Sequence, residues 1–174
     1  MRLRAFLLWL VLFCSGIAIA GEVDLSKYRL RVDGLGPIEI GMTSDAASAK
    51  LGVQLISLDI PDEGDGVCQY FYPDGKYDDI GFMVEDGRIT RIDVYSKTVP
   101  TSDGIRVGDS ETSVRKHFPG HVKESMHPYI GKEGKYLTVE PKPGFAFIFE
   151  TENGSITTFR SGKPDSVRYI EGCL

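Results

Sequence analysis

The sequence lacks the short motifs that mark the common enzyme classes. It contains no Gly-x-Ser-x-Gly nucleophile elbow, no Gly-x-x-x-x-Gly-Lys phosphate-binding loop and no dinucleotide-binding fingerprint. Ser125 and His127 lie close together in the chain, but without the elbow they do not define a hydrolase site. We therefore expect a protein that is not an enzyme and needs no cofactor.

Basic residues are scarce beyond the N-terminus. Loss of the first twenty residues, argued below, removes Arg2 and Arg4, so the 20 lysines and arginines fall to 18 against 25 acidic residues, a net charge of −7. Nucleic acids and anionic lipid surfaces are bound through a basic face. We therefore expect a partner of another kind, and no nucleic acid.

Long apolar runs are also absent, except near the start of the chain. Two arginines precede the run Ala5 to Cys14, and small residues follow, ending in Ala18-Ile19-Ala20. A membrane-spanning helix needs about 20 apolar residues, whereas this order is typical of a secretory signal peptide. Cys14 follows Phe13, where a lipoprotein signal has a small residue. We expect a signal peptide over residues 1–20, a periplasmic or secreted protein, and no stable membrane insertion after cleavage.

Of the three cysteines, only Cys68 and Cys173 remain after cleavage. An even pair in an exported chain indicates a disulfide. Closing so long a loop stabilises the fold by about 4 to 5 kcal/mol in the chain-entropy model. Two unpaired, buried thiols remain the alternative.

The chain matches itself at an offset of 67 residues. The opening segment of residues 36–44 falls on residues 103–111, and the match continues without a gap. Apolar, glycine and hydroxyl positions coincide: Ile38 with Ile105, Ile40 with Val107, Gly41 with Gly108, Thr43 with Ser110, Leu51 with Phe118, Phe82 with Phe149, Gly87 with Gly154 and Ile89 with Ile156. We therefore predict two tandem repeats: a lead-in over 21–35, repeat 1 over 36–102, repeat 2 over 103–162 and a C-terminal tail over 163–174.

Each repeat has the same predicted order of elements, which gives an α+β fold. A short alternating strand (38–40 or 105–107) leads to a helix that begins after Thr43 or Ser110, whose hydroxyls suit an N-cap. The helices end at Gly52 and at Pro119-Gly120. Strands and a hairpin follow, with turns at Asp86-Gly87 and Asn153-Gly154. We expect one or more short helices on one face of an antiparallel sheet in each repeat.

Two further segments carry structural predictions. The segment 145–151 is apolar on both of its faces, which favours burial between a helix layer and the neighbouring repeat; an exposed aromatic binding strip is the alternative. Residues 166–170 have a strand-like composition, and we expect this part of the tail to pair with a sheet and bring Cys173 to Cys68.

The two copies of about seventy residues, each opening with an Ile-x-Ile-Gly-Met-Thr-like signature, resemble the exported β-lactamase-inhibitory protein group. The single unit is similar to the small lipoprotein of the outer-membrane β-barrel assembly machine. The resemblance covers roughly residues 33 to 162. It implies helices on one face of an antiparallel sheet, and two sheets that form a concave surface gripping a partner protein. It assigns no binding residue in this chain.

Two other segments supply candidate partner-binding residues. Asp62 and Glu63 belong to an acidic loop, and Tyr70 and Tyr72 to an aromatic stretch; Tyr129 is a further candidate. A solvated loop and a core strand would explain the same residues.

All three histidines fall within eleven positions, at His117, His121 and His127. They are weak candidates for a zinc site, because Pro119 and Gly120 should end the helix that would align the first two. Surface histidines are the simpler interpretation.

Together these features favour an exported protein-binding module, such as an inhibitor of a hydrolase or an immunity-type protein. A structural component of the bacterial envelope is one alternative. A small-ligand or metal-binding periplasmic protein is another.

Overall fold

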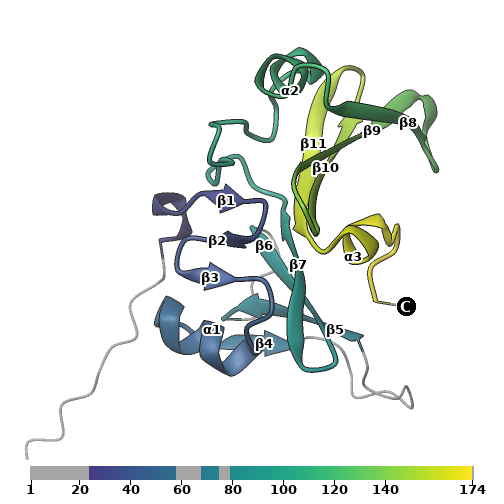
Figure 1. The fold of residues 1–174 in the computed structure, drawn as a ribbon. Helices are drawn as coiled ribbons and strands as arrows, with labels where there is room; N and C mark the ends of the chain where they lie inside the picture. Colours follow the sequence, from purple (N-terminus) through teal and green to yellow (C-terminus); the bar gives the residue numbers. More distant parts are fainter. Residues whose placement is uncertain (1–23, 58–67, 75–78, 174) are drawn as a thin grey trace, which may run out of the picture.

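The computed structural model describes residues 24–57, 68–74 and 79–173, and shows an α+β fold (Figure 1). The predicted signal peptide lies outside the described residues. The helices and strands follow in this order: η1 (Leu25–Lys27), β1 (Leu30–Arg31), β2 (Gly34–Leu35), β3 (Ile38–Glu39), α1 (Ser44–Leu51), β4 (Leu55–Ser57), β5 (Cys68–Pro73), β6 (Ile80–Glu85), β7 (Arg88–Val94), α2 (Glu111–His117), β8 (Val122–His127), β9 (Gly131–Lys142), β10 (Phe145–Glu152), β11 (Ser155–Gly162) and α3 (Pro164–Arg168).

Eight strands form one antiparallel sheet in the order β4-β5-β6-β7-β11-β10-β9-β8. Strands β4 to β7 make up one half of this sheet, and strands β8 to β11 make up the other. The halves meet where β7 pairs with β11. A second, three-stranded sheet of β1, β2 and β3 packs beside α1 (Figure 1).

Both predicted helices begin where their capping residues stand. The Thr43 hydroxyl accepts a hydrogen bond from the Ala46 amide at 3.2 Å, and α1 ends at Gly52 in the left-handed conformation. Helix α2 begins after Ser110, as predicted, but the Ser110 hydroxyl makes no such capping bond. A side-chain N-cap bond therefore stabilises α1 and not α2.

The two predicted hairpins are confirmed. Asp86 and Gly87 join β6 to β7, and Asn153 and Gly154 join β10 to β11. All four residues have positive φ, between 49° and 81°. This is the backbone that a two-residue turn of the primed type requires.

The opening strands differ between the halves. Ile38 lies in β3, but residues 105–107 form no strand, so that prediction is wrong. The backbone of Ile105 is instead engaged locally: its carbonyl accepts from the Thr101 amide and its amide donates to the Thr101 hydroxyl. A local turn has replaced the strand, although the Ile105 side chain is buried.

Other backbone contacts recur at the offset of 67. The Gly41 amide donates to the Ile89 carbonyl at 2.7 Å, and the Gly108 amide donates to the Ile156 carbonyl at 2.8 Å. Asp93 also pairs with Arg160 across β7 and β11. These two residues are themselves 67 positions apart, so the offset aligns them with each other.

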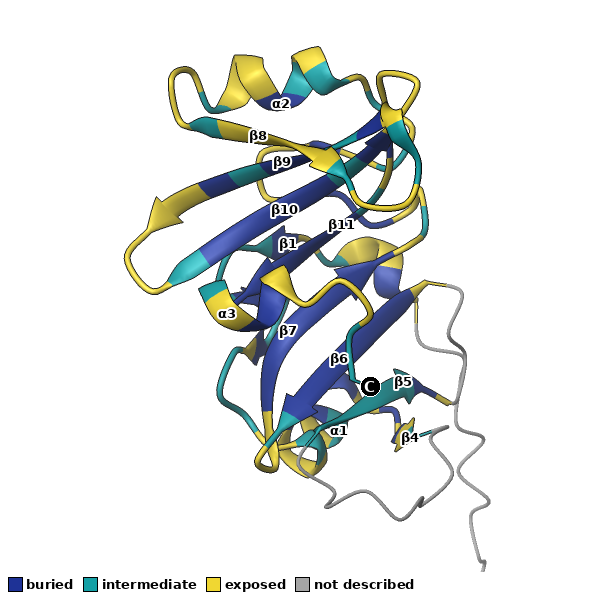
Figure 2. Cartoon of the chain, turned by 90° about the vertical axis from the view of Figure 1, so that its right-hand side faces the viewer, coloured by how far each residue is buried: buried dark blue, intermediate teal, exposed yellow. Residues whose placement is uncertain are grey.

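The two faces of the large sheet are covered differently (Figure 2). Helices α1 and α2 and the strands β1 to β3 pack on one face, which we call the core face, and bury a single apolar cluster fed by both halves. Helix α3 packs on the opposite face, which we call the tail face. A small cluster of Tyr136, Ala146, Ile148 and Val167 lies beneath it.

The strand β10 is buried on both faces, as predicted. Phe147 and Phe149 join the core-face cluster, whereas Ala146 and Ile148 join the cluster beneath α3. The second face is thus covered by the tail, and not by the neighbouring repeat as we expected. Phe147 and Phe149 are at most 2% exposed, so they form no exposed aromatic strip.

The tail forms a helix where we predicted a strand. Lys163 is the N-cap of α3 and Pro164 occupies its first turn, where a proline's missing amide costs nothing. Five residues are too few for a helix to be stable on its own propensity. Its contacts with the tail face therefore decide the conformation.

Candidate partner-binding site

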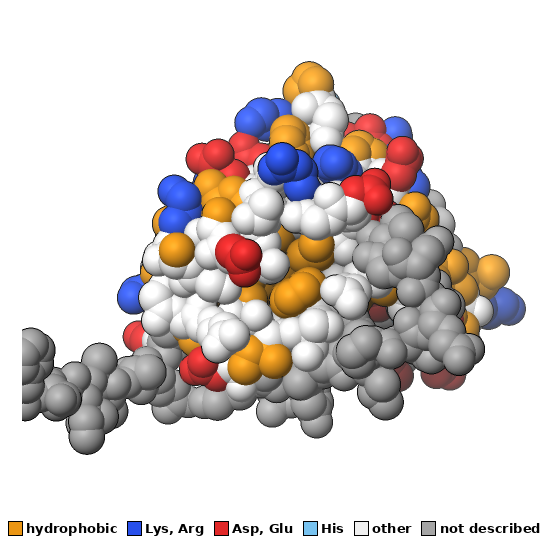
Figure 3. Space-filling model, turned by 90° about the horizontal axis from the view of Figure 1, so that it is seen from below, with side chains coloured by type: hydrophobic (Ala, Val, Ile, Leu, Met, Phe, Trp, Pro, Cys, Tyr) orange, Lys and Arg blue, Asp and Glu red, His pale blue; other side chains and the backbone are white. Residues whose placement is uncertain are grey.

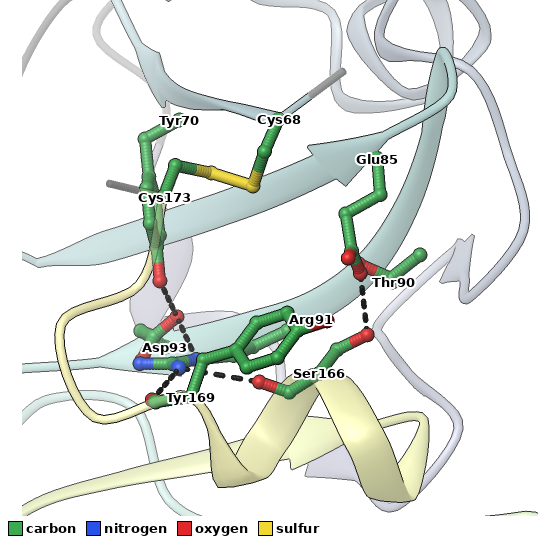
Figure 4. The surroundings of a disulfide bond; sticks show 9 residues. All are labelled: Cys68, Tyr70, Glu85, Thr90, Arg91, Asp93, Ser166, Tyr169 and Cys173. Carbon is green, nitrogen blue, oxygen red and sulfur yellow. Dashed lines mark hydrogen bonds and ion pairs between the residues drawn. A yellow bond between two sulfur atoms is a disulfide. The ribbon is translucent and has the colours of Figure 1, made fainter.

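The predicted disulfide is present between Cys68 in β5 and Cys173 in the tail (Figure 4). Their Cα atoms are 5.4 Å apart, within the usual range for such a bond. The bond ties the end of the chain to the first half of the sheet. Disulfides persist in oxidising compartments, so this one indicates a location outside the cytoplasm.

Arg91 of β7 holds the end of helix α3. Its guanidinium donates to both carboxylate oxygens of Asp93, with the shortest contact at 2.6 Å. It also donates to the carbonyls of Ser166 at 3.3 Å and Tyr169 at 2.7 Å (Figure 4). Arg91 and Asp93 are at most 4% exposed. Asp93 therefore neutralises the buried charge of Arg91, and Arg91 satisfies two backbone acceptors of the tail.

Arg160 of β11 repeats this role from the other half. Its Nε donates to the Val167 carbonyl at 2.6 Å, and its Nη1 forms an ion pair with Glu150. The guanidinium carbon lies 5.2 Å from the centre of the Tyr136 ring. Arg160 is 2% exposed, and its Nη2 has no hydrogen-bond partner among the described residues.

A third contact fixes the middle of α3. The hydroxyls of Ser166 and Thr90 both donate to the Glu85 carboxylate, each at 2.5 Å. The tail is thus held at four places: a disulfide, two arginines and this shared carboxylate.

Tyr70 connects the sheet to the end of the tail. Its hydroxyl donates to Asp93 at 3.1 Å. Its ring lies between two glycines: a Cβ at Gly81 would be 3.3 Å from the ring, and one at Gly172 would be 2.7 Å from it. Burial, and then the Asp93 charge, raise the pKa of Tyr70 well above its usual value. The phenol is therefore protonated and acts as a donor.

Tyr72 extends this aromatic surface along β5. Its ring centre is 6.0 Å from that of Tyr70, with only 18° between the ring planes. A Cβ at Gly81 would be 3.1 Å from the Tyr72 ring. The absence of a side chain at Gly81 therefore lets both rings lie close to the neighbouring strand.

A pocket of about 320 Å³ opens on the tail face at the junction of the two halves. Its walls come from β5, β7, β10, β11 and the end of the tail. We call it the tyrosine pocket; it is lined by Tyr70, Tyr72, Tyr95, Arg91, Asp93, Arg160, Glu150, Thr158, Ile170, Glu171 and Gly172. It is therefore a polar hollow with aromatic walls, which the closing disulfide holds in place.

The other predicted partner-binding residues lie elsewhere. Asp62 and Glu63 are outside the described residues. Tyr129 follows β8 and is 64% exposed, with its ring 6.0 Å from that of His127. The structure thus brings Tyr70 and Tyr72 together in the pocket but does not place Tyr129 there.

The histidines do not converge on one site. The His117 ring contacts the Ser113 carbonyl at the end of α2, whereas His127 lies 3.5 Å from Glu150 on the tail face. Among the described residues, no three side chains of metal-ligating type are grouped around a common point.

Sequence reasoning missed the charged residues of the pocket. Arg91 and Asp93 alternate with apolar residues in a strand of the predicted hairpin, and Arg160 sits at the end of its counterpart. Charged residues in a strand so close to the core are unusual and are normally paired. Charged residues within these apolar strands could therefore have indicated a buried ion pair.

The side of the molecule seen in Figure 3 shows basic and acidic side chains dispersed around hydrophobic ones. In the part of the chain that the structure describes, no helix is long and apolar enough to cross a membrane.

Solved structures resemble this chain to different degrees. An uncharacterized protein, YfeY from Escherichia coli, is 18% identical with a TM-score of 0.52, and the match covers 78% of this chain and 99% of that one. An extracellular protein containing an SCP domain, from Bacillus anthracis, is 13% identical with a TM-score of 0.49, over 72% of this chain and 44% of that one. No protein-family model matches the sequence, and no curated protein matches it. The likeness to YfeY concerns the fold alone.

Proposed function

We propose that this chain is an exported protein-binding module, periplasmic or secreted, that acts by binding and not by catalysis. The tyrosine pocket carries this proposal. It places three tyrosines and two arginines around a hollow on the tail face. Tyrosine and arginine are among the residues that dominate the binding energy of protein interfaces.

The pocket is also rigid before any partner arrives. The disulfide, Arg91 and Arg160 fix the tail, and the glycines at 81 and 172 fix the Tyr70 ring. A preorganised surface loses little conformational entropy on binding. Such a surface suits tight association with one partner.

We infer further that the two halves are tandem copies of one unit. Three observations support this. Each half contains one helix followed by four strands, and the Gly41 and Gly108 backbone contacts recur at the same offset. Asp93 and Arg160, which are separated by this offset, also pair with each other across β7 and β11. The pocket then lies at the junction of the copies, on the face opposite helices α1 and α2.

The partner that we propose is a protein, such as a hydrolase that the chain inhibits or a toxin against which it protects. The resemblance to the β-lactamase-inhibitory group suggests this class. A component of the envelope-assembly machinery would instead indicate a structural role.

The test is affinity capture with a matched control. The oxidised mature protein would be immobilised and exposed to envelope and secreted-protein extracts, beside the variant Tyr72→Ala/Tyr95→Ala. We expect one dominant protein on the first column and at least a tenfold loss on the second. Retained proteins would be identified by mass spectrometry and their affinity measured with purified material.

The variant Tyr129→Ala serves as the control, because this exposed tyrosine lies outside the pocket. It should capture the partner as the parent protein does. Equal capture by all three proteins would show that the pocket is not the binding site, and no specific capture by the parent would count against the proposed function.

A further inference from the structure

We propose that the tyrosine pocket receives a basic side chain of the partner protein, a lysine ammonium or an arginine guanidinium. This inference rests on the proposed function and names the chemistry of the group that fills the pocket. It follows from the charge, the aromatic walls and the size of the hollow.

The charge of the lining is negative. Two arginines face three acidic residues, Asp93, Glu150 and Glu171. Arg91 is engaged with Asp93 and with two backbone carbonyls of the tail, and Arg160 with Glu150 and the Val167 carbonyl; the Nη2 of Arg160 alone has no partner among the described residues. Glu171 is exposed at the end of the tail. It therefore adds a negative charge where an incoming group would meet the pocket.

The pocket walls also favour a cation. Tyr70 and Tyr72 present nearly parallel rings, and Tyr95 adds a third aromatic residue that is 38% exposed. The face of an aromatic ring attracts a cation, and this attraction grows when the cation is partly removed from water. An anion would instead meet a lining with one more carboxylate than guanidinium groups.

The behaviour of the phenols agrees with this geometry. Burial, and then the Asp93 charge, raise the pKa of Tyr70 and of Tyr95 well above their usual values. Both phenols therefore stay protonated and neutral beside an incoming cation.

The hollow is large enough to admit a single side chain. A pocket of about 320 Å³ lies at the lower end of the range for small-ligand sites. The net charge of the mature chain, −7, would also steer a basic surface toward it.

The direct test uses side-chain mimics on the oxidised mature protein. n-Butylammonium and n-butylguanidinium would be titrated at constant ionic strength, with n-butanol as the neutral analogue and butyrate as the anion. Amide shifts of Tyr95, Glu171 and Gly172 would be followed by NMR. We expect saturable shifts with both cations and at least tenfold weaker binding of n-butanol and butyrate.

Two pocket variants and one control sharpen the test. Tyr72→Leu and Glu171→Gln should each weaken cation binding by about three- to tenfold, from the lost ring face and the lost charge. Glu152→Gln removes the same charge from an exposed site at the end of β10 and should have no effect. Equal effects of Glu171→Gln and Glu152→Gln would show that only the overall charge of the protein matters, and would overturn the inference. Binding of n-butanol as tight as that of n-butylammonium would overturn it too.

The inference and the proposed function can fail separately. Excess n-butylguanidinium should release the captured partner, whereas n-butanol should not. A partner that depends on Tyr72 and Tyr95 but is insensitive to n-butylguanidinium and to Glu171→Gln would keep the proposed function and refute the basic side chain.

Discussion

The two faces of the eight-stranded sheet are covered through different kinds of interaction. On the core face, side chains from both halves merge into one apolar cluster. On the tail face, a small apolar cluster adjoins two arginine–carboxylate pairs. Apolar packing is non-directional, whereas a buried ion pair requires fixed geometry. The core face therefore supplies stability, and the tail face supplies a defined arrangement of chemical groups.

The disulfide should have the largest effect on this difference, because it alone fastens the tail covalently. The double variant Cys68→Ala/Cys173→Ala should lose about 4 to 5 kcal/mol in free energy of unfolding, measured by urea denaturation. The oxidised parent should show no thiol that can be alkylated before reduction. Two alkylated cysteines in that protein would refute the pairing.

A deletion in the core face should cost almost as much. Phe149 is fully buried and contacts Phe147, Phe159 and Phe118. Phe149→Ala should destabilise the fold by about 4 kcal/mol, from lost burial and the cavity left behind. Tyr129→Ala, at an exposed site, should change the same measurement by less than about 0.5 kcal/mol.

The tail face should respond in a way that no apolar core does. Arg91→Met leaves Asp93 buried without its cation and should cost about 3 kcal/mol. Adding Asp93→Leu should recover part of this loss, because no charge then remains unpaired, although the Ser166 and Tyr169 carbonyls and the Tyr70 hydroxyl lose their partners. A double variant less stable than Arg91→Met alone would show that the pair stabilises the fold by more than its mutual neutralisation.

The small cluster beneath α3 should give the weakest response. Val167 is fully buried against Tyr136, Ala146 and Ile148. Val167→Ala should cost about 2 kcal/mol, again by urea denaturation. If Val167→Ala lowered the free energy of unfolding as much as Phe149→Ala does, the two faces would not differ in what their apolar clusters contribute to stability.

The features that could be predicted from sequence are those that neighbouring residues determine. The turns at Asp86-Gly87 and Asn153-Gly154 and the cap at Thr43 are local chemistry, and all three are confirmed. The disulfide followed from the compartment and from an even cysteine count.

The errors concern segments whose conformation depends on distant residues. Helix α3 has five residues, and Arg91 binds the Ser166 and Tyr169 carbonyls near its end from a strand that is 75 to 78 positions away. No window of sequence around the tail contains that information. Of the candidate site, Tyr70 and Tyr72 were predicted, whereas the ion pairs became apparent only once β7 and β11 were placed side by side.

The fastening of the tail also sets the order in which this chain can mature. Synthesis from the N-terminus delivers residues 163–173 after both halves of the sheet. Until they arrive, Arg91 and Arg160 lack the carbonyl acceptors that they bind in the folded protein, and Cys68 lacks its partner. Contacts over such long separations slow folding. The contacts of the tail face therefore form last, and a chain that stops before residue 163 would leave the remaining donors of both arginines without acceptors and Cys68 as a free thiol.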